Sequence, residues 1–364
     1  MPNINNSKRL VFFDATLQSG GAERVISILA KHLLQCGYHV ELLLYHDQPV
    51  FYNMPANLKI ISVKRETGSK NLLKNILWMR RFFKENVDII ISFLAPFNML
   101  ALVAHFGLKS KIIVADRNDP HYIPSNFFLR KLRDILYLLA DSVVLQTKRN
   151  KEYFNSKIQA KSTVIYNPVD LEQKQGQALR TAKKDKIVCV GRLIPQKNQK
   201  ILLEAFARIK ENFPSYNIVF YGQGPLKNFL QDKAKQLVLS DKVQFAGNVK
   251  NIFDEISDAK LFVLTSDFEG MPNALIEAMC LGLPVISTDV SGARELIENG
   301  KSGFIVPKNS PKELAEIMQK VLSDNLLQKQ LGQQAVKLND ILKSSRILEQ
   351  WTKLIEKMGK NKCL

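Results

Sequence analysis

The sequence predicts an α/β protein made of two doubly wound, parallel-sheet domains. Short apolar runs that read as buried strands alternate with amphipathic helical stretches, which is the pattern of a parallel sheet covered by helices. The 364 residues exceed the usual size of one hydrophobic core. Residues 171–185 are polar with few apolar side chains, so we expect a linker there and a Rossmann-like domain on each side.

The first domain is predicted to span residues 1–170. Its expected strands are residues 9–16, 39–45, 58–63, 87–94, 111–117, 141–147 and 161–168, with helices such as residues 22–34 between them. Residues 89–108 contain no Asp, Glu, Lys or Arg, and a run of that length raises the question of a membrane span. Because Pro96 and Asn98 interrupt it, we interpret the run as a buried strand, a turn and a helix.

The second domain is predicted to span residues 186–340. Its expected strands are residues 186–192, 217–222, 243–247, 261–266, 284–288 and 303–307. Within residues 341–364 a helix is expected, because one face of it would carry a stripe of apolar side chains that includes Trp351. Such a helix must dock on a domain, and we expect that it can cross back to the first one.

Cysteine usage and the first residues bear on the compartment. Cys36, Cys189, Cys280 and Cys363 lack the spacing of a zinc site or a disulfide framework, which favours a reducing environment. The first residues lack the apolar core of a signal peptide, because Asp14 interrupts it. We therefore expect a cytoplasmic protein.

Two carboxylates bracket the most informative segment. Glu269 and Glu277 enclose residues 270–276, between one expected strand and the next. The first would lie in the loop before a helix and the second about two turns into the helix, at the sheet edge where α/β proteins bind ligands. The two side chains can therefore contact different parts of one long ligand, although a solvated acidic helix face is the alternative.

Three further segments of the second half follow expected strands. Arg192 and Lys197 lie in a strand-to-helix turn, where cations and backbone N–H groups favour a phosphate. The remaining two segments would bring backbone groups close to a ligand, and they contain Gly222, Gly224, Asn248 and Val249. Each segment taken alone is equally well explained as a plain turn.

A matching loop follows the first strand of the first half. Gly20 and Gly21 open the helix that follows, so the backbone there can approach a phosphate or an acceptor. A tight turn is the alternative for this pair as well.

These segments occur in the order found in family 4 of the retaining glycosyltransferases, which the chain resembles over nearly its whole length. The resemblance implies a GT-B fold, in which two Rossmann-like domains face a cleft. Residues 1–170 would be the acceptor domain, similar to the glycosyltransferase 4-like domain. Residues 186–340 would be the nucleotide-sugar domain, similar to the group 1 glycosyltransferase domain. The best-marked element is the pair of glutamates eight positions apart, Glu269 and Glu277.

The resemblance also implies roles for single residues. Arg192, Lys197 and Glu269 would be catalytic: the cations would stabilise the leaving diphosphate, while Glu269 would bind hydroxyls of the transferred sugar. Glu277 would hold the ribose hydroxyls. The other residues implied to bind the donor are Gly20, Gly21, Gly222, Gly224, Asn248, Val249, Gly270, Met271, Pro272 and Asn273. The family needs neither a bound metal nor a cofactor, and the nucleotide sugar is a substrate.

One position departs from the family pattern. Many members have a histidine after the fifth strand of the first domain, whereas this chain has Arg117, followed by Asn118 and His121. These residues are candidates for binding an acceptor or a sugar. Alternatively, Arg117 merely pairs with Asp116 or Asp119 at the surface of the loop.

Charge suggests a membrane surface as a partner. The net charge is +18, and the cationic excess is concentrated in the first half. Residues 70–84 and 126–136 mix bases with large apolar side chains, as helices at an anionic bilayer do. The candidate anchors are Trp78, Phe82, Phe83, Phe127 and Phe128. Core-facing helices with a basic outer face are the alternative.

The combined expectation is a retaining, metal-independent glycosyltransferase at the inner face of the cytoplasmic membrane. It would transfer a hexose or N-acetylhexosamine from a nucleotide diphosphate sugar, UDP-sugar favoured, to a polyprenyl-diphosphate-linked glycan. Related enzyme alternatives are a nucleotide-sugar epimerase and a glucan synthase. A basic nucleic-acid-binding protein is a more distant alternative, which the absence of a nucleic-acid-binding motif in the sequence disfavours.

Overall fold

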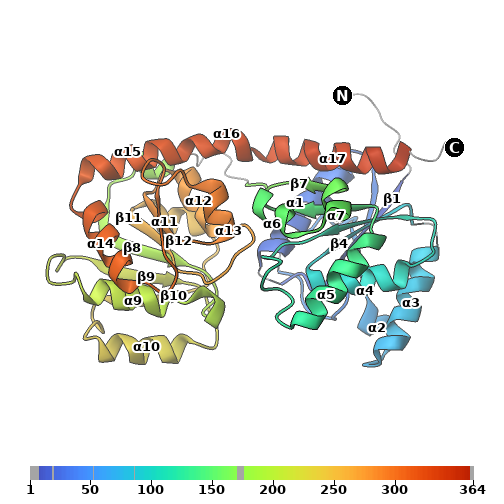
Figure 1. Cartoon of the computed structure of the whole chain (residues 1–364), viewed down its shortest axis with the longest axis horizontal. Coiled ribbons are helices and arrows are strands. Elements are labelled where there is room, and N and C mark those ends of the chain that lie inside the picture. The colour runs from blue at the N-terminus through green and yellow to red at the C-terminus, as the bar shows by residue number, and fades with distance from the viewer. Residues whose placement is uncertain (1–7, 19, 52, 86, 170–175, 361–364) are drawn as a thin grey trace. The chain divides into compact units, whose positions relative to one another are not determined.

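The computed structural model describes residues 8–18, 20–51, 53–85, 87–169 and 176–360. The chain forms two compact units. Unit 1 contains the residues up to Pro168 together with those from Ser344 onward, and unit 2 contains Val169–Lys343. Figure 1 shows helices on both faces of the parallel sheet in each unit.

Unit 1 is built on a seven-stranded parallel sheet with the order β3-β2-β1-β4-β5-β6-β7. Its strands are β1 (Arg9–Asp14), β2 (His39–Leu44), β3 (Lys59–Ser62), β4 (Ile89–Phe93), β5 (Lys111–Ala115), β6 (Ser142–Leu145) and β7 (Ser162–Val164). Its helices are α1 (Gly21–Gln35), α2 (Val63–Thr67), α3 (Leu72–Lys84), α4 (Ala95–His105), α5 (Phe127–Leu136), η1 (Tyr137–Leu139), α6 (Lys148–Tyr153), α7 (Ser156–Ala160) and α17 (Ser344–Lys360). The apolar run at residues 89–108 is the strand β4 followed by the helix α4, as predicted.

Successive side chains of β1 belong alternately to two hydrophobic layers, one on each face of the sheet. Leu10 and Phe12 pack on one face of the sheet, against α1 and α17. Val11 and Phe13 pack on the opposite face, against α3 and α4. Because successive side chains of a strand point to opposite faces, a strand buried on both sides reads as a continuous apolar run.

The last helix, α17, is part of the core of unit 1. Its Trp351 is fully buried and lies 6.1 Å, between ring centroids, from Phe93 at the end of β4. Ile347 and Ile355 are also fully buried in the same layer. The apolar stripe of this helix therefore covers one face of the unit 1 sheet, although Ser344 lies far from the sheet in sequence.

Unit 2 is built on a six-stranded parallel sheet with the order β10-β9-β8-β11-β12-β13. Its strands are β8 (Lys184–Val190), β9 (Asn217–Tyr221), β10 (Val243–Gly247), β11 (Ala259–Leu264), β12 (Val285–Thr288) and β13 (Phe304–Val306). Its helices are α8 (Gln177–Arg180), η2 (Pro195–Lys197), α9 (Lys200–Ala207), α10 (Lys227–Gln236), α11 (Ile252–Ser257), α12 (Asn273–Leu281), α13 (Ser291–Leu296), α14 (Pro311–Leu322), α15 (Asn325–Ala335), η3 (Val336–Leu338) and α16 (Asn339–Leu342).

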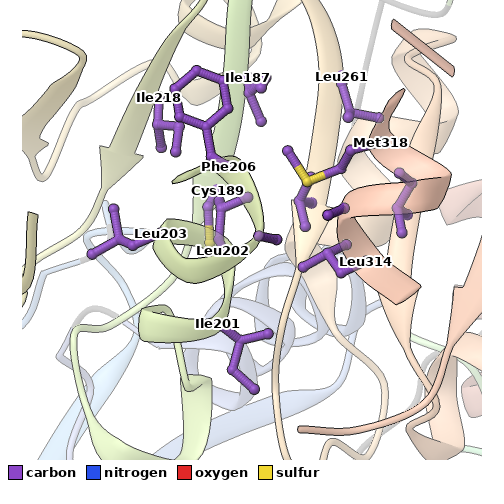
Figure 2. Close-up of a cluster of buried hydrophobic side chains, with 14 of the residues drawn as sticks. Ile187, Cys189, Ile201, Leu202, Leu203, Phe206, Ile218, Leu261, Leu314 and Met318 are labelled. Carbon is purple, nitrogen blue, oxygen red and sulfur yellow. The ribbon is translucent and has the colours of Figure 1, made fainter. Parts of the chain in front are cut away.

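One hydrophobic cluster holds the helices α9 and α14 on the same face of the unit 2 sheet. Figure 2 shows Phe206 of α9 and Met318 of α14 pointing toward side chains of the strands, among them Ile187 and Leu261. All four side chains are fully buried. This layer fixes the strands whose carboxyl ends carry the predicted donor residues.

The predicted linker at residues 171–185 differs from the structure. Residues 171–175 lie outside the described part of the chain, whereas residues 177–180 form the short helix α8. Ala178 of α8 is fully buried, and Lys184 already begins β8. Within the described ranges, no helix has the length and apolar character needed to cross a bilayer.

Candidate functional site

The predicted catalytic residues of unit 2 lie where its sheet changes direction. Chain order runs outward from β8 to β9 and β10 on one side, and from β11 to β12 and β13 on the other. β8 and β11 are therefore adjacent at the topological switch point, the place where open α/β sheets bind ligands. The loop after β8 carries Arg192 and Lys197, and the loop after β11 carries Glu269.

A set of hydrogen bonds ties these two loops together. The backbone N–H of Asp267 donates to the carbonyl oxygen of Gln196 at 2.8 Å. The side chain of Gln196 donates to the carbonyl oxygen of Phe268 at 2.9 Å. The hydroxyl of Thr265 donates to the carbonyl oxygen of Lys197 at 2.8 Å. The two loops therefore form one scaffold that holds its charged side chains in place.

Lys197 and Glu269 meet across the switch point. The ammonium group of Lys197 forms an ion pair with Oε1 of Glu269, and the two side chains are only 18% and 10% exposed. The hydroxyl of Ser266 donates to the same oxygen at 2.7 Å. Sequence reasoning named both charged residues but predicted neither their contact nor the contribution of Ser266.

Arg192 and Glu277 are the other two predicted charged residues at the carboxyl edge of the unit 2 sheet. Arg192 is exposed, and its carbonyl oxygen accepts a hydrogen bond from the side chain of Gln199 at 2.9 Å. Glu277 is buried within α12, which begins directly after Pro272. Because the first N–H groups of a helix favour negative charge, the start of α12 adds to the cationic character of the edge.

The predicted glycines after β9 have a structural explanation. A Cβ atom on Gly222 would lie 2.1 Å from the carbonyl oxygen of Gly191, and the backbone of Gly222 has a φ of +132°. Gly224 lies two residues further along the same loop. The close approach of two backbones accounts for Gly222 without any ligand, so its predicted contact with the donor stays a prediction.

The other donor residues lie along the same carboxyl edge. Asn248 is exposed and Val249 is half-buried directly after the edge strand β10. Gly270, Met271 and Pro272 are buried, and Asn273 is the first residue of α12. Sequence reasoning missed Gly292, where a Cβ atom would meet Pro272 Cδ at 2.4 Å. Gly292 thus lets α13 approach this loop.

In unit 1, the glycine pair opens α1. Gly20 is the N-cap residue of α1, and Gly21 is its first residue. A Cβ atom on Gly20 would lie 2.1 Å from the carboxylate of Glu23, so this side chain folds back over the turn. The predicted phosphate or acceptor contact of the glycine pair stays a prediction.

Arg117 lies inside unit 1, so the alternative of a surface ion pair is wrong. The residue is 7% exposed, and its Nη1 donates to Oδ1 of Asn167 at 2.9 Å. Its guanidinium lies over the rings of Phe93 and Trp351, at 5.0 and 5.7 Å from their centroids. Burial lowers the pKa of Arg117 to about 9, against the opposing influence of Asp14 and Asp116.

Asn118 and His121, the other two candidates, are more exposed. The backbone N–H of Asn118 lies 3.4 Å from Oδ1 of Asp116. The His121 ring pairs with Oδ1 of Asp119 at 2.9 Å and is 47% exposed. Their predicted role in acceptor or sugar binding stays a prediction.

Sequence reasoning missed the polar side chains that surround Arg117. Asp14 ends β1, and Gln146 follows β6 directly. Gln146 donates to Oδ1 of Asn167 at 2.7 Å, the same oxygen that Arg117 contacts. All of these residues stand at carboxyl ends of strands of the same parallel sheet, and that position was the signal that could have found them.

Burial also perturbs the carboxyl groups of this cluster. Asp14 is buried, and this burial raises its pKa well above the usual value, with Glu23 adding to the effect. Burial likewise raises the pKa of Asp116, whose Oδ2 accepts a hydrogen bond from the Tyr137 hydroxyl at 3.1 Å. Strongly perturbed groups of this kind cluster at functional sites.

No group of three or more His, Cys, Asp or Glu side chains that could hold a metal ion is found in the described part of the chain. Burial raises the pKa of the Cys189 thiol to about 12. Burial is also the main reason why the pKa of the Cys280 thiol is raised to about 12. Neither thiol has the low pKa of a reactive cysteine.

Comparison with known proteins matches both halves of the chain to family models. The model described as Glycosyltransferase Family 4 matches residues 19–173, and the model described as Glycosyl transferases group 1 matches residues 171–338.

Two similar curated proteins come from Campylobacter jejuni subsp. jejuni serotype O:2. One is named GalNAc-alpha-(1->4)-GalNAc-alpha-(1->3)-diNAcBac-PP-undecaprenol alpha-1,4-N-acetyl-D-galactosaminyltransferase. It is 29% identical over 95% of this chain and 98% of its own length. The other is named N-acetylgalactosamine-N,N'-diacetylbacillosaminyl-diphospho-undecaprenol 4-alpha-N-acetylgalactosaminyltransferase. It is 32% identical over 88% of this chain and 92% of its own length.

Solved structures share the fold over almost the whole chain. Anabaena HepE in complex with UDP superposes with a TM-score of 0.79 at 20% identity, covering 96% of this chain and 100% of its own. Sucrose-phosphate synthase from Thermosynechococcus elongatus gives a TM-score of 0.83 at 17% identity, covering 96% and 99%. The two parallel-sheet units and these solved structures define the GT-B fold, and the two family models define a glycosyltransferase. The chain belongs to family 4 of the glycosyltransferases, which confirms the predicted fold class and the resemblance.

Proposed function

We propose that the chain transfers a hexose or N-acetylhexosamine from a nucleotide diphosphate sugar to a polyprenyl-diphosphate-linked glycan, with retention at the anomeric carbon. The names of the two Campylobacter relatives support a glycan acceptor linked to undecaprenol through a diphosphate. The UDP bound to the fold neighbour HepE supports a UDP-sugar as donor.

The observation that carries the proposal is the ion pair between Lys197 and Glu269. It brings together residues from the loops after β8 and β11, and it is partly shielded from water. A cation beside a carboxylate at a switch point suits a ligand with an anionic diphosphate and a neutral sugar. Lys197 would bind the diphosphate, and Glu269 would accept hydrogen bonds from hydroxyls of the sugar.

The reaction then needs charge stabilisation at the leaving group. As the bond from the anomeric carbon to the diphosphate oxygen breaks, negative charge grows on the diphosphate, beside Arg192 and Lys197. Each preorganised donor of this kind contributes about 3 to 4 kcal/mol in the transition state. The acceptor hydroxyl attacks on the face from which the diphosphate departs, and its proton passes to the departing phosphate oxygen.

The remaining donor contacts follow the same edge of unit 2. Glu277 would hold the ribose hydroxyls, and residues 270–273 would approach the sugar and phosphates with main-chain groups. Asn248 and Val249, beside the glycines after β9, would contact the base. In unit 1, Gly20 and Gly21 would contribute backbone N–H groups. No metal ion or cofactor takes part in this proposal.

We further propose that unit 1 binds the surface of an anionic membrane through α5, on the cytoplasmic side. Phe127, Phe128 and Ile135 of α5 are 57%, 78% and 62% exposed, and Arg130 and Lys131 lie close to the Phe127 ring. Among the residues of α5, all of which the structure describes, only Arg133 is buried. The buried Arg133 side chain thus anchors α5 to the interior of unit 1, while apolar side chains of the helix are exposed to solvent. This arrangement suits the headgroup region of a bilayer.

The predicted anchors of α3 fit this proposal less well. Phe83 is only 1% exposed and belongs to the core of unit 1, so the prediction that it is a membrane anchor is wrong. Trp78 and Phe82 are half-buried against the same core. On α3 the exposed apolar side chains are instead Leu72, Leu73 and Leu77.

The proposal is tested first by thermal unfolding with a panel of UDP- and GDP-sugars. A donor at 100 times its Kd should stabilise the protein by about 2.7 kcal/mol. We expect one UDP-sugar to raise the Tm and Glu277→Ala to abolish the shift, while Glu211→Ala, at an exposed position of unit 2, leaves it intact. If no nucleotide sugar raises the Tm, the donor site is refuted.

A second assay separates the transferase from the enzyme alternatives. The donor is incubated with a polyprenyl-diphosphate-linked glycan, and products are analysed by mass. A lipid product heavier by one sugar supports the proposal. An altered free nucleotide sugar without acceptor identifies an epimerase, and extension of a soluble glucan identifies a glucan synthase.

A further inference from the structure

The residue that follows Lys197 has an uncommon backbone conformation. Asn198 has φ +46° and ψ +40°, in the left-handed region, and the residue is 7% exposed. Asparagine is one of the few residues besides glycine that enter this region readily. Asn198 ends the short helix η2, and its carbonyl oxygen accepts a hydrogen bond from the N–H of Ile201 at 3.1 Å. The conformation accounts equally well for a glycine, so the side chain needs a separate explanation.

The side-chain amide of Asn198 connects three loops at the carboxyl edge of the unit 2 sheet. Its Nδ2 donates to Oδ1 of Asp267 at 2.7 Å and to Oδ1 of Asn309 at 2.8 Å. Asp267 lies in the loop after β11 and Asn309 in the loop after β13, whereas Asn198 belongs to the loop after β8. Because an ionised carboxylate only accepts hydrogen bonds, the amino group of Asn198 must face Asp267. Both N–H bonds of the amide are then used.

These hydrogen bonds act on the backbone on both sides of Lys197. On the C-terminal side, the carbonyl oxygen of Lys197 accepts from the Thr265 hydroxyl at 2.8 Å. On the N-terminal side, the carbonyl oxygen of Gln196 accepts from the N–H of Asp267 at 2.8 Å. Asp267 therefore holds Gln196 through its backbone and Asn198 through its carboxylate. The side chain of Asn198 closes a ring of contacts that encloses the backbone of Lys197.

The Lys197 side chain has little support from its own helix. The helix η2 is only three residues long and ends at Lys197. A single turn of this kind has poor hydrogen-bond geometry, and a lysine side chain is long and flexible. Its ion-pair partner, Glu269, comes from the loop after β11. The place of the ammonium group therefore depends on how tightly the two loops are held together.

We propose that Asn198 is a positioning residue, which fixes the place where Lys197 presents its ammonium group to the donor diphosphate. This inference rests on the proposed function for the identity of the ligand. Asn198 makes no contact with the donor and acts only through Lys197. Because negative charge grows on the diphosphate as its bond to the sugar breaks, a displaced ammonium group lowers kcat more than it raises KM for the donor.

Three variants separate the backbone of Asn198 from its side chain. Asn198→Gly keeps access to the left-handed conformation and removes both side-chain hydrogen bonds. Asn198→Asp places a second carboxylate opposite Asp267. Combining Asn198→Asp with Asp267→Asn restores a hydrogen bond of reversed direction, because the introduced amide donates to the introduced carboxylate. The amide of Asn309 can turn its own amino group toward that carboxylate as well.

Val238→Gly is the matched control. Val238 also has a left-handed backbone, with φ +55°, but it is 73% exposed, close after α10 and outside the contacts described above. This variant shows what a glycine at a left-handed position does by itself. Thermal unfolding checks that every variant folds, and UDP titration of the wild type by calorimetry checks the proposed donor site independently.

The kinetic test measures kcat and the KM for the donor in transfer from a UDP-sugar to a lipid-linked acceptor. We expect Asn198→Gly and Asn198→Asp to lower kcat roughly tenfold or more, with a smaller change in KM. The combined variant should recover kcat to within about threefold of the wild type, and Val238→Gly should retain it. A purely structural asparagine would give wild-type kcat in Asn198→Gly or no recovery in the combined variant, and either result would overturn the inference.

A crystal structure of unliganded Asn198→Gly gives a second test that needs no activity. We expect the ion pair between Lys197 and Glu269 to be displaced or broken, whereas an ion pair in its wild-type place would overturn the inference. If UDP does not bind to the wild type, the proposed donor site is wrong, and the crystal structure still decides whether Asn198 positions Lys197. If UDP binds and Asn198→Gly keeps its kcat, the donor site stands and the positioning role falls.

Discussion

At the scale of single residues, the proposed chemistry of unit 2 uses two charged side chains whose contact sequence spacing did not indicate. Lys197 and Glu269 are 72 residues apart, and the hydroxyl of Ser266 supports the carboxylate. In the absence of a donor, the ion pair keeps both side chains in place and compensates their partial burial. A donor diphosphate would then bind to a cation that is already positioned.

We predict that Lys197→Ala lowers kcat at least 100-fold, because it removes one preorganised donor at the developing charge of the leaving diphosphate. The measurement is transfer of radiolabelled sugar to a lipid-linked acceptor at saturating donor. Lys200→Ala is the matched control, since Lys200 is exposed at the start of α9. Activity of Lys197→Ala within fivefold of the wild type would contradict the diphosphate role.

Asp14 shows the stability cost of the unit 1 cluster. Burial raises its pKa well above the usual value of 3.8, and the attraction of Arg117, which lowers the pKa, is the smallest of the effects. Between pH 3.8 and the raised pKa, the folded state holds a proton that the unfolded state has released. The free energy of unfolding therefore falls as pH rises from 3.8 to the raised pKa. Above the raised pKa, the folded protein bears the full cost of burying the Asp14 carboxylate.

Asp14→Asn is expected to raise the Tm at pH 7.5, because the variant has no carboxylate to desolvate. The gain should shrink as pH falls through the raised pKa toward 3.8, below which the wild-type carboxyl is mostly protonated in both states. Thermal unfolding of wild type, Asp14→Asn and the control Glu66→Gln, at an exposed position of unit 1, gives the comparison across this range. A gain that is independent of pH, or that is equal in Glu66→Gln, would refute the assigned cause.

At the scale of elements, α17 joins the last residues of the chain to the core of unit 1. Trp351 is among the largest fully buried side chains, and its ring stacks on Phe93 and lies beside Arg117. The helix therefore closes one hydrophobic layer of the sheet, and its Trp351 ring packs beside the guanidinium of Arg117.

We expect Trp351→Ala to lower the free energy of unfolding of unit 1 by about 3 to 5 kcal/mol, the range for removal of a large buried aromatic side chain. Trp351→Phe should cost less, because it keeps a ring against Phe93. Urea unfolding followed by hydrogen exchange resolves unit 1 from unit 2. Equal loss of protection in both units would contradict a role confined to unit 1.

At the scale of the whole molecule, the charge of +18 makes association with anionic surfaces favourable. Each base near an anionic membrane contributes about 1 kcal/mol, and salt screens the attraction. The exposed phenylalanines of α5 add an apolar contact that salt does not weaken. Peripheral binding would then bring unit 1 to lipid-linked acceptors.

The expected outcome for Phe127→Ser with Phe128→Ser is loss of most binding to vesicles that contain anionic lipid, measured by co-sedimentation. Phe229→Ser is the matched control, because Phe229 is 51% exposed on α10 of unit 2. Binding to neutral vesicles should be weak for all proteins, and high salt should reduce the wild-type signal. Loss of binding that is equal in the control would refute the role of α5.

The fold was largely predictable because its signals are local. A strand buried on both faces reads as a continuous apolar run, and the turn residues that follow each strand are adjacent in sequence. Strands such as Arg9–Asp14 and Ile89–Phe93 lie within their predicted ranges. The order of the loops containing Arg192, Lys197, Glu269 and Glu277 was enough to indicate the family.

What only the tertiary structure decided is the partnership of residues that are distant in sequence. The ion pair of Lys197 with Glu269, and the convergence of Asp14, Arg117 and Gln146, depend on the order of strands in each sheet. Burial of Arg117 beneath Trp351 depends on the return of α17 to unit 1. Spacing along a chain fixes which element carries a residue, whereas packing of elements fixes what that residue touches.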